Sequence, residues 1–229
     1  MTGLFLGRAR LKHDAPVSAL ARLLVPESRD DRVAAAHRLV WTLFADDPDR
    51  KRDFLWREEE PGRFMTLSPR PPVDSHNLFD LVFKPFEPTL SAGDRLGFSL
   101  RVNPVVARPV AKGQRGKRHD VVMNALRDVP PGKRAEARPE AMAAAGQDWL
   151  MRQGLAHGFA PLGQATCDGY DQIRIPRGGK MAPAVFGVMD INGVLEVRDP
   201  ALFLDRLTTG FGRARAYGYG LMLIRRARP

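Results

Sequence analysis

The sequence has a single cysteine, Cys167, which excludes an internal disulfide and any metal site built from a cysteine cluster. Its five histidines are never paired at i, i+3 or i, i+4 spacing, so a metal centre is not expected. No apolar run approaches the length of a membrane span, and residues 1–8 lack the charged lead and long apolar core of a signal peptide. These absences favour a protein of the reducing cytoplasm that needs no metal or other cofactor.

Two common enzyme motifs are also missing, since the sequence has neither a Walker loop nor a G-x-S-x-G nucleophile elbow. The segment Gly210–Gly220 has the sequence Gly-Phe-Gly-Arg-Ala-Arg-Ala-Tyr-Gly-Tyr-Gly. It is not a dinucleotide-binding motif, because its glycines follow an expected helix and precede an expected strand. Any catalysis is therefore expected to be acid/base chemistry by isolated side chains.

Acidic residues are absent from residues 206–229, which contain six arginines. Glycines without a Cβ allow the backbone of this stretch to come close to a ligand, and the arginines between them supply positive charge. This combination favours a phosphate backbone as the ligand. The candidate contacts are Gly210, Gly212, Arg213, Arg215, Gly218 and Gly220. The alternative is a set of tight turns whose arginines are only solvated.

The net charge of +10 is unevenly distributed. Residues 1–106 contain 16 basic and 15 acidic side chains, whereas residues 107–229 contain 20 basic and 11 acidic ones. The basic excess therefore belongs to the second half, which we expect to bind nucleic acid or another anionic surface. Further basic candidates lie in two glycine-containing segments: Lys112, Arg115, Lys117, Arg118, Arg177 and Lys180. For residues 174–180 the alternative is an ordinary solvated turn.

The order of expected elements indicates an α+β fold of tandem ferredoxin-like (RRM-like) β-α-β-β-α-β domains, residues 1–107 and 108–229. The first domain is expected to contain strands at 3–11, 54–58, 64–68 and 96–106, and a helix capped by Asp30 or Asp31 that ends at Phe44. In the second half, residues 107–119 are expected to be an exposed linker or loop, followed by a helix at 139–153. The remaining expected elements are strands at 173–175, 184–190 and 194–197, an Asn192-Gly193 hairpin turn, a helix from Pro200 and a strand at 219–226.

His37 is the strongest candidate for a catalytic side chain. The expected first helix places it on one stripe with Val33, Val40, Trp41 and Phe44. Burying a histidine costs the free energy of its hydration, which a hydrogen-bond partner or a functional role offsets. Histidine also titrates near neutral pH, as an acid/base catalyst must. The alternative is a half-buried structural histidine.

Two further sites have open interpretations. His119 stands next to Lys117 and Arg118, which favour its neutral form, so it is either a base or a loop residue near phosphate. Tyr217 and Tyr219 alternate on the expected last strand, where they either pack in the sheet or stack on bases.

Several motifs together resemble one known family. They are the helix Ala34–Phe44 with His37, Arg52–Trp56, Gly93–Leu96 leading into Leu100–Pro104, Gly116–His119, Gly178–Lys180 and the final glycine run. In this order and spacing the chain resembles the CasE (Cse3) endoribonucleases of type I-E CRISPR systems, over nearly its whole length.

The resemblance implies tandem ferredoxin-like domains that hold an RNA hairpin on a basic face and cleave it without metal at the base of the stem. His37 matches the family's catalytic histidine. The tyrosine that the family often has three residues earlier is Ala34 here, so Lys180 or another basic loop residue is expected to supply charge. The implied partners are the CRISPR repeat stem-loop, the mature guide RNA and other Cascade subunits.

The expected reaction is attack of the RNA's own 2′-hydroxyl on the adjacent phosphate, with His37 as general base or general acid. The products would be a 2′,3′-cyclic phosphate, or its opened form, and a 5′-hydroxyl. One alternative is a non-catalytic subunit that binds RNA hairpins with the same basic face. The other is an enzyme that acts on a small anionic substrate held by the glycine run.

Overall fold

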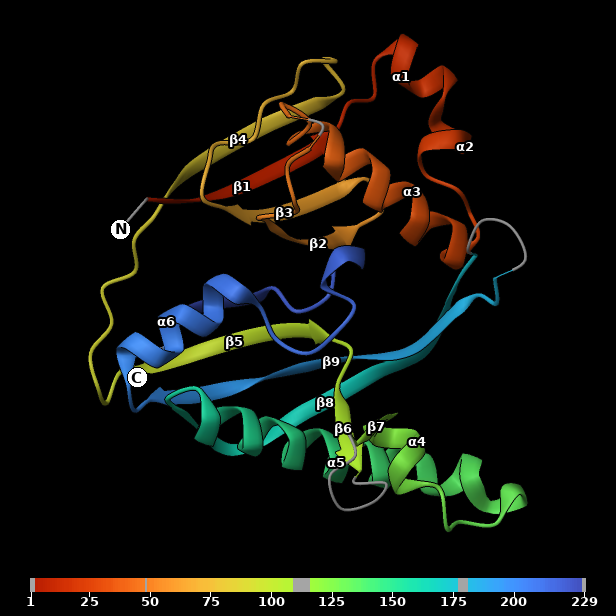
Figure 1. The fold of residues 1–229 in the computed structure, drawn as a ribbon, viewed down its shortest axis with the longest axis vertical. Helices are drawn as coiled ribbons and strands as arrows, with labels where there is room; N and C mark the ends of the chain where they lie inside the picture. The colour runs from red at the N-terminus through yellow and green to blue at the C-terminus, as the bar shows by residue number, and fades with distance from the viewer. Residues whose placement is uncertain (1–2, 48, 109–115, 177–180, 228–229) are drawn as a thin grey trace. The chain divides into compact units, whose positions relative to one another are not determined.

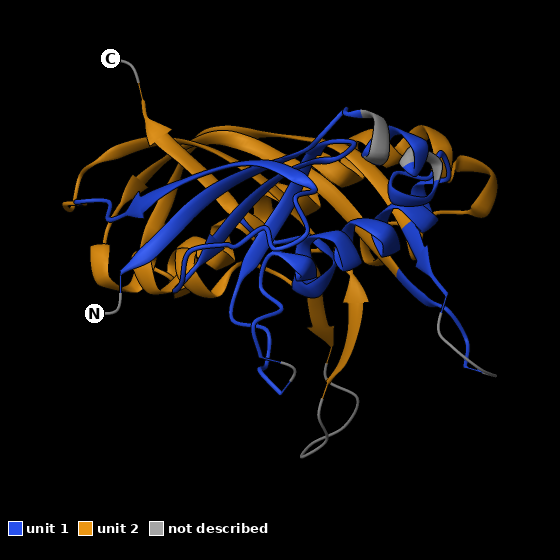
Figure 2. Cartoon of the chain, turned by 90° about the horizontal axis from the view of Figure 1, so that it is seen from above, with its two compact units in different colours: residues 1–89, 173–185, 214–221 blue, residues 90–172, 186–213, 222–229 orange. Residues whose placement is uncertain are grey.

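The computed structural model describes residues 3–47, 49–108, 116–176 and 181–227, which form an α+β fold with two four-stranded antiparallel sheets. The chain divides into two compact units (Figure 2). Unit 1 comprises residues 1–89, 173–185 and 214–221, and unit 2 comprises residues 90–172, 186–213 and 222–229. Each unit therefore contains segments from both halves of the sequence.

Unit 1 is built on a sheet with the strand order β2-β3-β1-β4 (Figure 1). Its strands are β1 (Leu4–Leu11), β2 (Leu55–Glu60), β3 (Arg63–Ser68) and β4 (Phe79–Phe86). Its helices are α1 (Ala15–Ala19), α2 (Ala21–Leu24), α3 (Arg29–Thr42) and the short 3₁₀ helix η2 (Arg215–Tyr217). Strand β4 is not among the strands expected from the sequence.

Helix α3 packs on one face of this sheet because its apolar residues recur at helical spacing. Ala36, Leu39 and Val40 are buried in one cluster with side chains of the sheet, among them Ala9 and Phe64. The helix begins after Ser28, and Asp30 and Asp31 lie in its first turn, where negative charge is favourable. The predicted helix is thus confirmed, although Ser28 rather than an aspartate occupies the capping position.

Unit 2 contains a second sheet with the strand order β10-β5-β9-β8. Its strands are β5 (Arg95–Val102), β8 (Phe159–Ile175), β9 (Ala184–Val197) and β10 (Met222–Arg226), and the ends of β8 and β9 extend into unit 1. A separate hairpin joins β6 (Val105–Arg108) to β7 (Lys117–Asp120). The helices are α4 (Val121–Ala125), the 3₁₀ helix η1 (Pro131–Lys133), α5 (Arg134–Ala156) and α6 (Pro200–Thr209).

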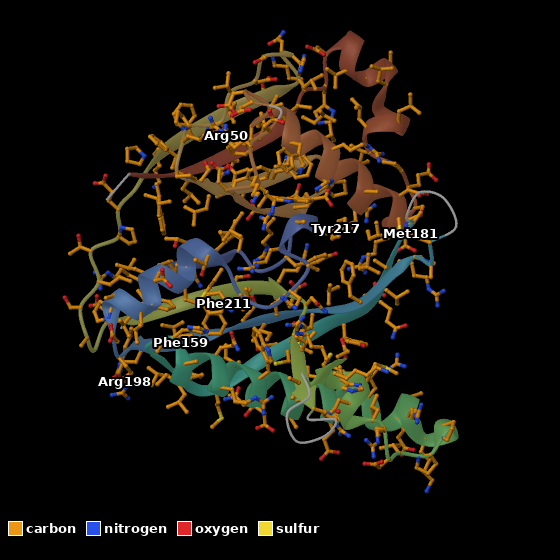
Figure 3. The ribbon with its side chains drawn as sticks, in the orientation of Figure 1. Arg50, Phe159, Met181, Arg198, Phe211 and Tyr217 are labelled. Atoms are coloured by element: carbon orange, nitrogen blue, oxygen red, sulfur yellow. The ribbon has the colours of Figure 1, made fainter. Side chains whose placement is uncertain are left out.

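The second core is made by helices α4, α5 and α6 with the second sheet. Trp149 and Leu150 of α5 and Phe203 of α6 are buried in one cluster with strand residues. Phe159 packs against Phe203 and Phe211, with ring centroids 5.4 and 6.0 Å apart. Phe159 and Phe211 are labelled in Figure 3. Each unit therefore has its own hydrophobic core, as expected of a domain.

Three sequence predictions about this unit differ from the structure. The strand expected at 96–106 as the end of a domain 1–107 is β5, which hydrogen-bonds to β9 and β10 in unit 2. Residues 107–108 and 117–119 of the expected linker 107–119 lie in β6 and β7, which are paired as a hairpin. The expected turn at Asn192-Gly193 lies inside β9, where a Cβ on Gly193 would come 3.3 Å from the ring of Phe98.

Candidate functional site

The candidate site in unit 1 is centred on His37, near the middle of α3. Its side chain is half-buried, and it lies four residues before Trp41, so both side chains are on the same face of the helix. The indole Nε1 of Trp41 donates a hydrogen bond to Nε2 of His37 at 2.9 Å. Because an indole N–H can only donate, Nε2 must carry a lone pair, and the proton of the neutral imidazole lies on Nδ1.

Three causes lower the pKa of His37. The largest is burial of the ring, followed by the positive charges of Arg52 and Arg38. All three disfavour the charged form of histidine. The imidazole is therefore held neutral, the protonation state that an acid/base catalyst needs in order to accept a proton.

Arg52 lies in the segment before β2, and its guanidinium donates to the carbonyl oxygen of Phe54. Burial and then the charge of Arg215 lower the pKa of Arg52, so two guanidinium groups repel one another in this part of unit 1. Such a pair is stabilised when an anion binds between or beside the two cations.

Tyr217, on η2 (Figure 3), also contacts the histidine. The ring centroids of Tyr217 and His37 are 5.5 Å apart, with the planes tilted by 42°. The position of η2 is fixed by Trp56, whose Nε1 donates to the carbonyl oxygen of Ala216 at 3.0 Å. Side chains separated by 180 positions in the numbering are thus brought together on one surface of unit 1.

The glycine run is shaped by contacts with the protein itself. Gly218 has φ of 85°, and a Cβ there would lie 2.8 Å from the ring of Trp56. In unit 2, a Cβ on Gly212 would lie 2.6 Å from the carbonyl oxygen of Asn103, which also accepts a hydrogen bond from the backbone N–H of Arg213. These two glycines therefore make room for Trp56 and Asn103, and contact with a ligand stays a prediction for the run.

The other predicted contacts are distributed over both units. Arg215 is half-buried in unit 1, whereas Gly210, Gly212 and Arg213 belong to unit 2. Gly220 belongs to unit 1 and has φ of 96°. Lys117 and Arg118 are exposed on β7 in unit 2, with His119 beside them. The remaining predicted contacts lie outside the described residues: Lys112, Arg115, Arg177 and Lys180.

Three neighbours of His37 are not predicted from the sequence to act on it. Trp41 is expected only as part of the apolar stripe, although the sequence shows that it lies four residues after His37, on the same face of the helix. Arg52 and Tyr217 are far from His37 along the chain, and no local pattern predicts their proximity. Within the described ranges, no group of three or more His, Cys, Asp or Glu side chains is arranged to hold a metal ion. The described helices also include none long and apolar enough to cross a membrane.

Comparisons with known proteins agree on one family. The family model for CRISPR associated protein matches residues 4–226. The CRISPR-associated endoribonuclease Cse3 of Thermus thermophilus is 31% identical over 150 residues, covering 62% of this chain and 60% of that protein. The Cascade subunit CasE of Escherichia coli is 26% identical over 219 residues, covering 90% of this chain and 98% of that protein.

The fold has a counterpart among solved structures. Thermus thermophilus Cse3 bound to an RNA representing a pre-cleavage complex superimposes with a TM-score of 0.67, at 23% identity, covering 97% of this chain and 99% of that one. At this identity the similarity demonstrates a shared fold.

Proposed function

Because this chain belongs to the CasE/Cse3 family of CRISPR-associated proteins, we propose that it cleaves CRISPR repeat hairpins in precursor RNA and stays bound to the mature guide RNA. The proposal includes assembly with other Cascade subunits in the cytoplasm, since the E. coli relative is a Cascade subunit. The observation that carries it is a neutral His37, hydrogen-bonded to Trp41 and close to a pair of arginines.

The proposed reaction needs no metal, because the substrate supplies its own nucleophile. The 2′-hydroxyl before the scissile phosphate attacks the phosphorus in line, and the 5′-oxygen of the next nucleotide leaves. His37 moves a proton in this step, which typically contributes about 10²–10⁴-fold in rate. Arg52 and Arg215 stabilise the negative charge on the phosphoryl oxygens as the bond to O2′ forms.

We also propose that both units are ferredoxin-like, so that the chain is a tandem repeat of one module. The supporting observation is the strand order. In β2-β3-β1-β4 and in β10-β5-β9-β8, the first strand lies between the third and fourth, and the second lies outside the third. Residues 69–78, all of which are described, form no helix in unit 1, so its second helix is missing.

In the proposed division of labour, the first module carries the catalytic His37 and the second presents basic residues to the RNA stem. Lys117 and Arg118 on β7 and Arg213 are exposed and suited to phosphate contacts. Recognition would rest on hairpin shape and the backbone, because A-form RNA hides its major-groove base edges.

A repeat hairpin with a single 2′-deoxy nucleotide at the scissile position tests the reaction class. We expect the protein to bind this RNA as tightly as the unmodified hairpin and to leave it intact, because the nucleophile has been removed. The unmodified hairpin should give one fragment ending in a 2′,3′-cyclic phosphate and one with a 5′-hydroxyl. Cleavage of the deoxy substrate would refute the mechanism, and binding of both RNAs without cleavage would indicate a non-catalytic binding subunit.

A further inference from the structure

We propose that Trp41 is a positioning residue that fixes the tautomer of His37 and commits this side chain to start the reaction as a base. This inference rests on the proposed function. The hydrogen bond from Trp41 Nε1 to His37 Nε2 leaves the lone pair on Nε2 and the proton on Nδ1. Protonation of Nε2 would place two N–H donors against each other, so the bond exists only with the neutral imidazole.

The indole is held in this position by its own packing. Its ring meets Phe54 edge to face, with centroids 5.1 Å apart, and Phe54 is stacked on Phe44 at 4.2 Å. The carbonyl oxygen of Phe54 also accepts the hydrogen bond from Arg52. One buried residue therefore positions both groups that act on His37: the indole through its ring and the guanidinium through its backbone.

The positive charges of Arg38 and Arg52 favour the same neutral state of the imidazole. Arg38 lies on α3 itself, Arg52 in the segment before β2, and Tyr217 and Arg215 on η2. The two groups whose charges shift the pKa of His37 are both cations. These cations disfavour the charged imidazole but do not distinguish its two neutral tautomers. The directional hydrogen bond from Trp41 selects one of them.

The resulting step is a proton transfer at Nε2. The 2′-hydroxyl of the RNA replaces the indole N–H as donor to Nε2, and its proton moves to that nitrogen. The electron pair left on O2′ forms the bond to phosphorus, and the P–O5′ bond breaks with its electron pair on O5′, which takes a proton from solvent water. The imidazolium then returns its proton to solvent, and Trp41 again donates to Nε2.

Nitrogen NMR of the labelled full-length protein tests this assignment without RNA. In the wild type, the ¹⁵N shifts of His37 should report an unprotonated Nε2 and a protonated Nδ1 at neutral pH. Trp41→Phe keeps the ring against Phe54 but removes the N–H, so we expect a mixture of tautomers. The pKa of His37 should rise by about half a unit to one unit, because a hydrogen bond to the neutral form is lost.

Trp149→Phe is the matched control, since Trp149 is buried in the core of unit 2 and should leave both His37 signals unchanged. A wild-type spectrum with the proton on Nε2 would overturn the proposal without any variant. So would a Trp41→Phe protein that is folded, by its melting curve, and keeps the wild-type tautomer and pKa.

The pH dependence of cleavage supplies the second readout. Under single-turnover conditions with subsaturating protein, the acidic limb of the rate profile should move to higher pH in Trp41→Phe by the same amount as the His37 pKa. A movement of the basic limb instead would assign His37 as an acid and overturn the base role. Lack of cleavage by the wild type would refute the proposed function, whereas the NMR result would still decide the assignment of Trp41.

Discussion

The longest helix between the first and second strands of each sheet contributes differently in the two units. In unit 2 this helix is α5, whose buried Gly146, Trp149, Leu150 and Gly154 pack against the sheet. In unit 1 it is α3, which buries an apolar stripe and also carries the hydrogen-bonded pair His37 and Trp41. The same strand order thus supports one helix whose buried residues pack on its sheet and one that also presents the His37–Trp41 pair, and the proposed chemistry therefore belongs to unit 1.

The comparison predicts that changes around α3 affect the cleavage rate. Arg52→Ala or Arg215→Ala should lower the single-turnover rate on the order of 100-fold, because charge that stabilises the transition state is lost. Arg50 is the matched control, since it lies two residues from Arg52 and is ion-paired with Asp46 and Asp47 at 3.3 and 3.8 Å (Figure 3). A loss with Arg50→Ala equal to that with Arg52→Ala would remove the specific role of the arginine pair.

Changes in α5 should affect stability and leave the chemistry intact. A Cβ on Gly154 would overlap the backbone carbonyl oxygen of Phe159, which cannot move as a flexible side chain can. Gly154→Ala should therefore destabilise the protein by roughly 1–2 kcal/mol, a fall in Tm of roughly 2–8 °C, with an unchanged cleavage rate at low temperature.

Gly132 in η1 offers the control for this experiment, because nothing lies within 4 Å of a Cβ built there. Gly132→Ala should change the free energy of unfolding by less than about 0.5 kcal/mol. If the two alanine variants have the same Tm, close packing at Gly154 does not hold α5 in place.

A smaller effect is expected from single basic residues of unit 2. Arg118→Ala should reduce the slope of log Kd against log salt for the repeat hairpin by about one unit or less, because one phosphate contact is lost. Arg198 is exposed in the same unit and ion-paired with Glu196 at 3.0 Å, so Arg198→Ala should leave the slope unchanged (Figure 3). Equal slopes for all three proteins would exclude Arg118 as a phosphate contact.

The smallest expected effect is a pH dependence of stability from His37. Its pKa is lowered in the folded protein, so between that value and the ordinary value of about 6.5 the unfolded state binds more protons. Stability from this group is present above pH 6.5 and falls as the pH drops through this window. Because glutamine does not titrate, the fall in Tm between pH 7.5 and pH 5 should be smaller in His37→Gln than in the wild type, with a difference of a few degrees or less. An identical fall in both proteins would contradict the lowered pKa of His37.

The sequence predicted those features that depend on local pattern. The α+β class is confirmed, as are the strands around 55–60 and 63–68 and a helix that places His37 on its inner stripe. Strand β8 was reduced to residues 173–175, because its proline and glycines resemble loop sequence. Gly163 and Gly169 indeed have positive φ within it.

Features set by long-range packing were not predicted. Gly193 is expected to be a turn residue, whereas it lies in β9, opposite Phe98 of β5, where a Cβ would come 3.3 Å from the Phe98 ring. Likewise, Arg52 and Tyr217 come close to His37 only when the first sheet and η2 are assembled. Local periodicity therefore identified the candidate catalytic histidine but not the groups that set its protonation state.

The most direct test of the central claim is cleavage of the repeat hairpin by wild type and His37→Ala in EDTA, under single-turnover conditions with binding measured in parallel. We predict a single cut by the wild type and a rate at least about 100-fold lower in the variant, with RNA affinity retained. Equal cleavage by both proteins, or cleavage by the wild type that EDTA abolishes, would contradict metal-free catalysis through His37.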